Sequence, residues 1–304
     1  MKALYLLLIV LLFSSCKEDT INPLSNYLST IGKTPIKFEV GNITTSGIEY
    51  GGSLSLLKEE IYYTKASSDF STRNILVSKF NKDSFGSPKE VEFGGVIFNN
   101  ASDIRISENG NTVYFKMRGH IQNDSLRRDG NIWKSKKVGE VWGQAQMLPK
   151  EINSKLDEFY PAITNSKNLY FSRELKDTSY DIYVSRYENG LYQEAERLPG
   201  YINTNLLESD AYIAPDESYM IFVRMYADDG LGVSDLYISF KENDVWSQPK
   251  NMTSLNSPGV DGSPFVTSDG KYLFFTSTRD SDRPEVFDGH LDIYVTKFNI
   301  EDWK

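Results

Sequence analysis

Short runs in which apolar and polar residues alternate recur along the whole chain, and turn-forming residues separate them. The turns are rich in Gly, Asn and Asp, as in Glu108-Asn109-Gly110 and Ser268-Asp269-Gly270. Alternation between such turns is typical of β-strands that pair as antiparallel hairpins. The most aromatic runs occur once in every repeat: Ile61–Tyr63, Val113–Phe115, Leu169–Phe171, Met220–Phe222 and Leu273–Phe275. Because no long apolar run with helical spacing follows residue 13, the pattern predicts an all-β fold.

A second pattern returns at a nearly fixed spacing. Asn or Asp, then Ile or Leu, then a bulky residue starts at positions 74, 131, 181, 235 and 292, so the steps are 57, 50, 54 and 57 residues. A period of this length marks one supersecondary unit that is repeated around or along an axis. Each period contains four predicted strands, which matches the blade of a β-propeller. We therefore predict five four-stranded blades, with six as the less favoured number.

The two ends of the chain predict how the ring closes. The fifth repeat stops at Trp303-Lys304 and lacks its fourth strand. The segment Thr34–Phe38 resembles the missing strand, as comparison with Ser247–Met252 shows. A solenoid would need polar caps at its ends instead of such a complement. The N-terminal segment is therefore predicted to complete the last blade, so that the propeller spans residues 34–304.

One strand pair carries a motif that extends this prediction. Pro264–Phe275 reads P-F-V-T-S-D-G-K-Y-L-F-F, and Ala214-Pro215-Asp216 keeps part of the same pattern. This resembles the TolB-type, WD-repeat-like propeller family, whose strand pair reads P-x-F-S-P-D-G-K-x-L-Y-F. The resemblance implies a propeller and a periplasmic or surface binding module. The five repeats counted here differ from the six blades of TolB.

The N-terminus indicates where the protein is sent. Lys2 precedes an apolar run from Ala3 to Phe13, and the only cysteine of the chain follows at Cys16. A charged start and an apolar segment of this length are typical of a signal peptide, and the run is short for a membrane span. The small residues before Cys16 resemble the lipobox of bacterial lipoproteins, which implies cleavage before Cys16 and its acylation. An ordinary secretory signal is the alternative.

The segment after the cysteine adds to this interpretation. Lys17-Glu18-Asp19 resembles the charged export tag of Bacteroidetes lipoproteins. We therefore expect a signal peptide at residues 1–15 and a polar tether at residues 16–33. The expected location is the outer membrane, with the protein facing the cell surface or the periplasm.

Composition narrows the chemistry. The formal net charge is −9, which argues against a nucleic acid or an anionic membrane surface as the main ligand. One cysteine and two histidines, His120 and His290, are too few for a Cys/His zinc site and disfavour a His-based hydrolase. We expect no metal, no cofactor and a monomeric propeller.

Charged residues recur beside the first two strands of each repeat. Because these strands are antiparallel, residues before the first and after the second fall on one face of the ring. An acid precedes the first strand at Glu49, Asp103, Glu158, Glu208 and Asp261, with Asp103 offset by about two positions. A base follows the second strand at Lys65, Arg118, Arg173, Arg224 and Arg279. The longest loops, such as 118–130 and 279–289, lie on the same face.

This ring of acids and bases has three interpretations. The acids can pair with the bases and tie blades together. They can bind a cation or a polar ligand at the mouth of the channel. Two carboxylates can also hydrolyse a glycosidic bond, although acids at one place in every blade favour a structural role. We therefore expect a non-enzymatic binding or scaffold module for a protein or glycan partner, with a carbohydrate-active propeller as the alternative.

Overall fold

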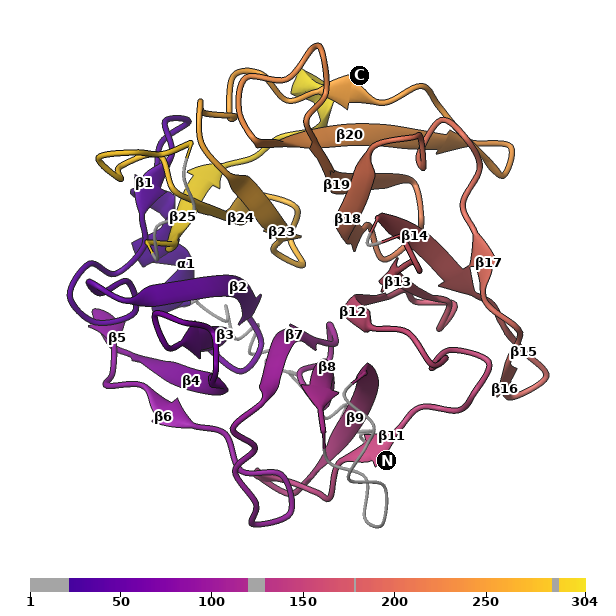
Figure 1. Ribbon diagram of the computed structural model, residues 1–304. Helices are drawn as coiled ribbons and strands as arrows, with labels where there is room; N and C mark the ends of the chain where they lie inside the picture. Colours follow the sequence, from indigo (N-terminus) through magenta and orange to yellow (C-terminus); the bar gives the residue numbers. More distant parts are fainter. Residues whose placement is uncertain (1–21, 120–128, 178, 286–289) are drawn as a thin grey trace, which may run out of the picture.

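The computed structural model describes residues 22–119, 129–177, 179–285 and 290–304. Five small antiparallel sheets are arranged radially around a common centre, as a five-bladed β-propeller (Figure 1). The predicted fold class and number of blades are therefore confirmed. Within the described residues no helix is both long and apolar enough to span a membrane.

Each blade runs from an inner strand at the centre to a short outer strand at the rim. Blade 1 contains β2 (Ile48–Ser55), β3 (Glu60–Ala66), β4 (Arg73–Asn81) and β6 (Lys89–Glu90). Blade 2 contains β7 (Ala101–Ile106), β8 (Thr112–Arg118), β9 (Gly130–Val138) and β11 (Gln146–Met147). Blade 3 contains β12 (Glu158–Ile163), β13 (Leu169–Glu174), β14 (Tyr180–Ser185) and β17 (Glu196–Arg197). Blade 4 contains β18 (Leu207–Ile213), β19 (Tyr219–Met225), β20 (Ser234–Glu242) and β22 (Lys250–Asn251). Blade 5 contains β23 (Asp261–Val266), β24 (Tyr272–Ser277), β25 (Asp292–Lys297) and β1 (Ile36–Lys37).

Short strands extend the third strand of most blades into a hairpin at the rim. They are β5 (Ser84–Phe85), β10 (Val141–Trp142) and β21 (Val245–Trp246). In blade 3 the corresponding hairpin is a separate two-stranded sheet made of β15 (Tyr187–Glu188) and β16 (Leu191–Tyr192). The chain ends after a short 3₁₀ helix, η1 (Ile300–Asp302).

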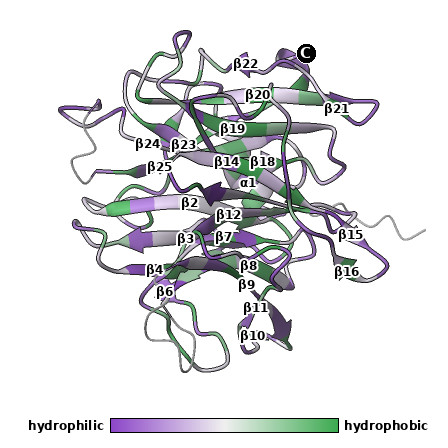
Figure 2. Ribbon diagram, turned by 45° about the vertical axis from the view of Figure 1, so that its right-hand side comes forward, coloured by the Kyte–Doolittle hydropathy of each residue, from purple (hydrophilic) through white to green (hydrophobic). Residues whose placement is uncertain are grey.

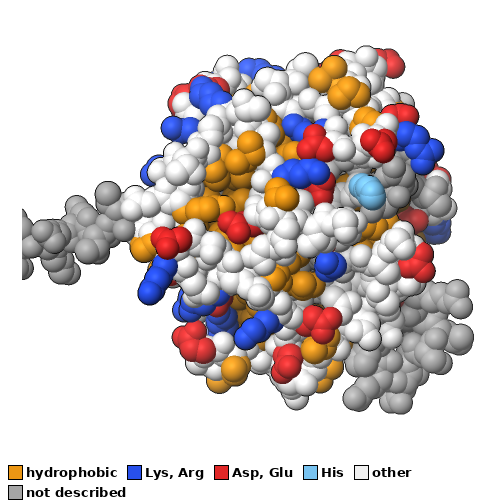
Figure 3. Space-filling view, turned by 90° about the vertical axis from the view of Figure 1, so that its left-hand side faces the viewer, with side chains coloured by type: hydrophobic (Ala, Val, Ile, Leu, Met, Phe, Trp, Pro, Cys, Tyr) orange, Lys and Arg blue, Asp and Glu red, His pale blue; other side chains and the backbone are white. Residues whose placement is uncertain are grey.

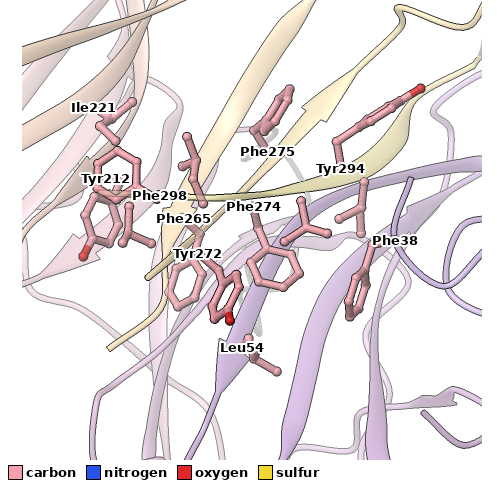
Figure 4. Close-up of a cluster of buried hydrophobic side chains, with 14 of the residues drawn as sticks. Phe38, Leu54, Tyr212, Ile221, Phe265, Tyr272, Phe274, Phe275, Tyr294 and Phe298 are labelled. Carbon is pink, nitrogen blue, oxygen red and sulfur yellow. The ribbon is translucent and has the colours of Figure 1, made fainter. Parts of the chain in front are cut away.

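The N-terminal strand closes the ring, as predicted. β1 pairs antiparallel with β25, so that Ile36 lies opposite Val295 and Lys37 opposite Tyr294. The next residue, Phe38, donates its backbone N–H to the carbonyl of Ile293 at 2.8 Å. Its side chain is 1% exposed and packs on Phe274 at a ring separation of 5.0 Å (Figure 4). Buried aromatic contacts of this kind hold the first and last segments of the chain together.

The segment before β1 differs from the expected tether. Residues Pro23–Ser29 form a helix, α1, whose Leu24 and Leu28 are buried in the core. The side chain of Asn22 accepts hydrogen bonds from the backbone of Leu24 and Ser25, and Pro23 occupies the first turn. A cap and a proline at these positions favour the start of a helix. Any tether therefore ends before residue 22, and residues 1–21 lie outside the described structure.

The surface separates polar loops from apolar strands. Figure 2 shows hydrophobic segments within the stacked strands and hydrophilic ones along many peripheral loops. Figure 3 shows acidic and basic side chains interspersed over the side of blades 1 and 5, with no single-sign patch in that view. The propeller has two different ends. The long-loop face carries the connections between second and third strands, and the turn face carries the hairpins between first and second strands.

Candidate functional site

Every inner strand contains a β-bulge at the same level of the channel. The register with the second strand shifts there in all five blades. One residue of each bulge has a positive φ, between 49° and 68°: Gly51, Asp103, Tyr160, Asp210 and Ser263. Four of the five are not glycine, and such backbone strain is concentrated at functional sites. Bulges also re-aim side chains, so this layer is the first candidate for chemistry.

Two carboxyl groups belong to the bulge layer. Neither Asp103 nor Asp210 forms an ion pair within 4.0 Å in the part of the chain that the structure describes. Burial, followed by the charge of Asp103, raises the pKa of Asp210 to about 7. Burial also raises the pKa of Asp103, and the charges of Lys116 and Arg73 oppose that shift. At neutral pH the layer therefore holds a carboxyl group poised between its two protonation states.

Arg105 crosses the channel just below this layer. Its side chain is buried, and its Nη2 donates to the carbonyl of Pro264 at 2.7 Å. The guanidinium carbon lies 5.5 Å from the ring centroids of both Tyr160 and Phe265. Its Nε and Nη1 atoms are buried without a hydrogen-bond partner among the described residues. Burial consequently lowers the pKa of Arg105, and the nearby carboxylates oppose that shift.

A hydrogen-bond chain links three blades at the same level. The hydroxyls of Tyr160 and Ser263 are hydrogen-bonded, and Ser263 Oγ donates to Asp210 Oδ2 at 3.5 Å. Burial raises the pKa of Tyr160 well above its ordinary value, so its hydroxyl stays protonated. The Tyr160 proton therefore points toward Ser263 when Ser263 donates to Asp210.

A cavity of about 210 Å³ lies above the bulge layer, toward the long-loop face. Its lining residues come from blades 1, 2 and 3: Tyr50, Arg73, Asn100, Ser102, Asp103, Lys116, Arg118, Phe159 and Tyr160. Asp157, just before β12, accepts from Lys116 Nζ at 3.1 Å and from Arg118 Nη2. These contacts hold the pKa of Asp157 below its ordinary value against its burial. The cavity thus has three bases, one acid on its wall and Asp157 behind it.

Four of the predicted acids are paired within their own blades. The pairs are Glu49–Lys65 at 2.9 Å, and Glu158–Arg173, Glu208–Arg224 and Asp261–Arg279 at 2.8 Å each. All four carboxylates are 0% exposed. Each also accepts the backbone N–H of a Ser or Thr four residues earlier: Thr45, Ser154, Thr204 and Ser257. These bonds fix the loop that enters each inner strand, which is a structural task.

Blade 2 departs from this scheme, and the expected place of Asp103 in the acid ring is corrected. The position equivalent to the other acids is occupied by Ala101, which lies opposite Met117, and both are buried. An apolar pair has thus replaced the acid–base pair, and Asp103 occupies the bulge two residues later. Arg118 correspondingly bonds Asp157 rather than Asp103. The ring of five equivalent acid–base pairs is therefore a set of four.

The sequence contained a signal for the bulge layer. In a blade with a paired acid, the bulge residue with positive φ lies two positions after that acid, as Asp210 does after Glu208. The offset of Asp103 from the other acids in the sequence is the same two positions, so it marked Asp103 as a bulge residue. Arg105, Tyr160 and Ser263 had no such signal, because their contacts cross between blades. Of the two histidines, His290 is exposed and His120 lies outside the described residues. The described residues contain no group of three or more His, Cys, Asp or Glu side chains placed to hold a metal.

Solved structures share this architecture. A thermostable family-43 glycoside hydrolase matches with a TM-score of 0.55 and 11% identity over 86% of this chain and 91% of its own. An arabinanase from Bacillus subtilis matches with a TM-score of 0.54 and 8% identity over 85% and 97%. A protein assigned as TolB from Agrobacterium tumefaciens matches with a TM-score of 0.49 and 12% identity over 84% and 92%. Identities this low establish the fold alone, since one fold hosts many functions.

Two other comparisons yield nothing. No protein-family model matches the sequence. No curated protein matches it significantly either. Evidence on the function therefore comes from the side chains of the channel.

Proposed function

We propose that this protein is a lipid-anchored binding module of the bacterial cell envelope. Its ligand site is the cavity at the long-loop end of the channel, where a protein or glycan partner inserts an end group. The observation that carries this proposal is the cavity itself, with Arg73, Lys116 and Arg118 on its walls and Asp103 at its floor. Binding residues often lie where loops meet a rigid scaffold, as they do here.

Size and chemistry indicate what the cavity accepts. A volume of about 210 Å³ suits one sugar ring or one amino-acid side chain rather than a whole domain. Lys116 and Arg118 share the carboxylate of Asp157, so three bases stand against two acids, Asp103 and Asp157, and the excess positive charge favours a group that carries negative charge. Asp103 offers acceptors for hydroxyl or amide protons. The rings of Phe159 and Tyr50 supply apolar contact beside these polar groups. The partner's remaining surface would then rest on the loops around the opening.

The anchor is the second part of the proposal. Cys16 lies outside the described residues, and its role rests on the resemblance of residues 1–16 to a lipoprotein signal. Two or more acyl chains give stable membrane attachment, whereas a single chain gives marginal attachment. The described structure begins at Asn22, only a few residues later, so a lipidated Cys16 would hold the propeller close to the membrane.

The paired acids support a non-enzymatic role. Glu49, Glu158, Glu208 and Asp261 are each neutralised by a base and fully buried, so none can exchange a proton with a substrate. In all four blades these acids instead bind the backbone of the loop that precedes the inner strand. Among the acids of the described inner strands, Asp103 and Asp210 are the two that form no ion pair within 4.0 Å.

Sedimentation with the native envelope tests the binding role. A soluble chain with Cys16→Ser is mixed with envelope from cells that lack the protein, and the bound fraction is measured against concentration. We expect saturable binding that Arg118→Glu weakens by about tenfold or more, because one charge reversal opposite an anion costs over 1.4 kcal/mol. Lys271→Glu, the same charge change on the turn face, should leave binding unchanged. Equal binding by both variants would show that the cavity is not the binding site.

A second candidate is a carbohydrate-active enzyme, and one observation favours it. Asp103 is buried and Asp210 is half-buried, neither forms an ion pair within 4.0 Å among the described residues, and the pKa of Asp210 is raised to about 7. A raised pKa is what a general acid needs, and a second carboxylate can act as base or nucleophile. Asp210 would protonate the leaving oxygen and Asp103 would activate the attacking group.

Hydrolysis assays separate the two candidates. Arabinan and aryl arabinosides are the first substrates to test, because two structural neighbours are named arabinanases. Turnover by the wild type that Asp103→Asn and Asp210→Asn both abolish would establish the enzyme. Turnover that survives both substitutions would come from a contaminant. No turnover on a broad glycan panel, together with Arg118-dependent binding, supports the binding module.

A further inference from the structure

A second concave surface lies between blades 2 and 3, on the turn face and away from the channel. Its volume is about 420 Å³, and its walls come from β8, β9, the hairpin between β12 and β13, and the detached hairpin β15–β16. We call it the interblade groove. Six side chains carry the argument: Lys134, Lys136, Lys167, Tyr114, Tyr192 and Glu108.

The three lysines of the groove are not neutralised by the protein. Lys134 and Lys136 are two residues apart in β9 and therefore point to the same side of the sheet. Lys167 faces them from the hairpin of blade 3. None of the three forms an ion pair in the part of the chain that the structure describes, and Glu108 is the one acid on the walls. Such a basic patch on a chain of net charge −9 points to an anionic ligand.

Lys134 occupies a position that is apolar in the other four blades. The equivalent residue in the other blades is Val77, Val184, Ile238 or Val295, each one step past the same tripeptide. Val184, Ile238 and Val295 are buried in the core, and Val77 packs against it. Blade 2 alone places a charged side chain there. A local departure from a pattern that stabilises the other blades is expected at functional sites.

The electrostatic environment of Lys134 supports the same reading. Burial, followed by the charge of Lys136, lowers its pKa. A bound anion would relieve both effects, because it pairs with the charged form that burial disfavours.

The remaining walls suit a sugar ring. Tyr114 of blade 2 and Tyr192 of blade 3 both line the groove and bring their phenol groups to it. Lys167 Nζ lies 5.3 Å from the centroid of the Tyr187 ring, so cation and aromatic surface are adjacent. Aromatic rings give apolar contact to sugar C–H groups, hydroxyls bond sugar hydroxyls, and lysine ammonium groups act as adaptable point charges for carboxylates. A nucleic acid fits less well, since its extended phosphates would meet an otherwise acidic protein.

We infer that the interblade groove binds an acidic polysaccharide, with a uronate carboxylate between Lys134, Lys136 and Lys167. The inference is independent of the ligand in the channel, because the two sites lie on opposite faces. In an envelope protein, this groove would fix the orientation of the propeller against a polyanionic glycan layer.

The test uses polygalacturonate as probe and affinity electrophoresis or calorimetry as readout. Binding should fall at least tenfold in the double variant Lys134→Val, Lys136→Gln, and should weaken with added salt. Lys134→Val installs the residue type of the other blades, so the fold is expected to be kept, and thermal unfolding checks this. Lys79→Glu is the matched control, because Lys79 is the blade 1 equivalent of Lys136. Fully methyl-esterified polygalacturonate, which lacks the charge, should bind at least tenfold more weakly.

Three outcomes overturn the inference. The first is no measurable binding of polygalacturonate or alginate by the folded wild type. The second is equal loss in Lys79→Glu and in the double variant, which would show general charge attraction. The third is equal binding of the methyl ester. Because the channel variant Arg118→Glu leaves the groove intact, a failure here is distinguishable from a failure of the channel site.

Discussion

Arg105 of blade 2 donates through Nη2 to the carbonyl oxygen of Pro264 in blade 5, at 2.7 Å. This single bond spans the channel and divides it. The bulge layer and the cavity of the long-loop face lie on one side. On the other side, toward the turn face, lies a mostly apolar pocket of about 60 Å³ lined by residues such as Leu54, Ile106 and Val266. A ligand that enters the cavity from the long loops therefore meets Asp103, which lines the cavity, before it meets Arg105.

Asp210 should make the stability of the protein depend on pH. The folded state holds its proton up to about pH 7, whereas the unfolded chain releases it near 3.8. The folded state thus binds more protons between these values, so the free energy of unfolding decreases as pH rises through this window. We expect Asp210→Asn to be more stable than wild type by about 1–3 kcal/mol near pH 8, and equally stable near pH 4.

Urea unfolding at both pH values measures this difference. Asp216→Asn is the control, because Asp216 lies at an exposed turn and its pKa is lowered by hydrogen bonds from Ser218. If the difference in unfolding free energy between wild type and Asp210→Asn were the same at both pH values, the raised pKa of Asp210 would be contradicted.

The paired acids should be structural. Glu208 accepts from Thr204 N at 3.0 Å, Thr204 Oγ1 at 2.6 Å and Arg224 Nε at 2.8 Å. Glu208→Ala leaves the buried guanidinium of Arg224 uncompensated and should cost about 3–5 kcal/mol of unfolding free energy. Asp302→Ala, which breaks the exposed pair with Lys33, should cost about 0–1 kcal/mol. Equal costs in urea denaturation would show that the buried pairs do not hold the blades.

Much of this fold could be predicted from residues alone. Strand alternation, the period of the Asn/Asp-Ile/Leu tripeptide and the unfinished fifth repeat fixed the blades and the closure by β1. The helix α1 was missed because it is short and its Leu24 and Leu28 are buried only by tertiary contacts. Asp103 was placed in the wrong layer because its two-residue offset was taken as a shift of the same acid, whereas Ala101 occupies the acid position in blade 2. Arg105 could not be found at all, since its position depends on the radius of the ring.

Ring closure should depend on Phe38 more than on its neighbour. Phe38→Ala removes a buried ring from contacts with Phe274 and Phe85, and should cost about 3–5 kcal/mol. Ile36→Ala changes a side chain of the adjoining strand β1 that is 49% exposed, and should cost less than about 0.5 kcal/mol. Thermal unfolding checks both variants. If the two variants melted alike, closure by this segment would not stabilise the ring.

The lipid anchor predicts a simple change of location. Cys16→Ser removes the thiol that would be acylated, so the protein should move from the membrane fraction to the soluble fraction or the medium. Metabolic labelling with an alkyne fatty acid should mark the wild type and not the variant. A variant that stays membrane-bound after a high-salt wash would exclude acylation of Cys16 as the anchor.

Photo-crosslinking in living cells tests the channel site most directly. The photoreactive amino acid p-benzoylphenylalanine replaces either Asn100, which is exposed on the cavity rim, or Lys271, which is exposed on the turn face of blade 5. After irradiation, gel mobility reveals covalent adducts. We predict an adduct from position 100 that disappears when Arg118→Glu is added to the same chain, and none from position 271. Adducts from position 271 alone, or adducts from position 100 that persist with Arg118→Glu, would contradict binding at the cavity.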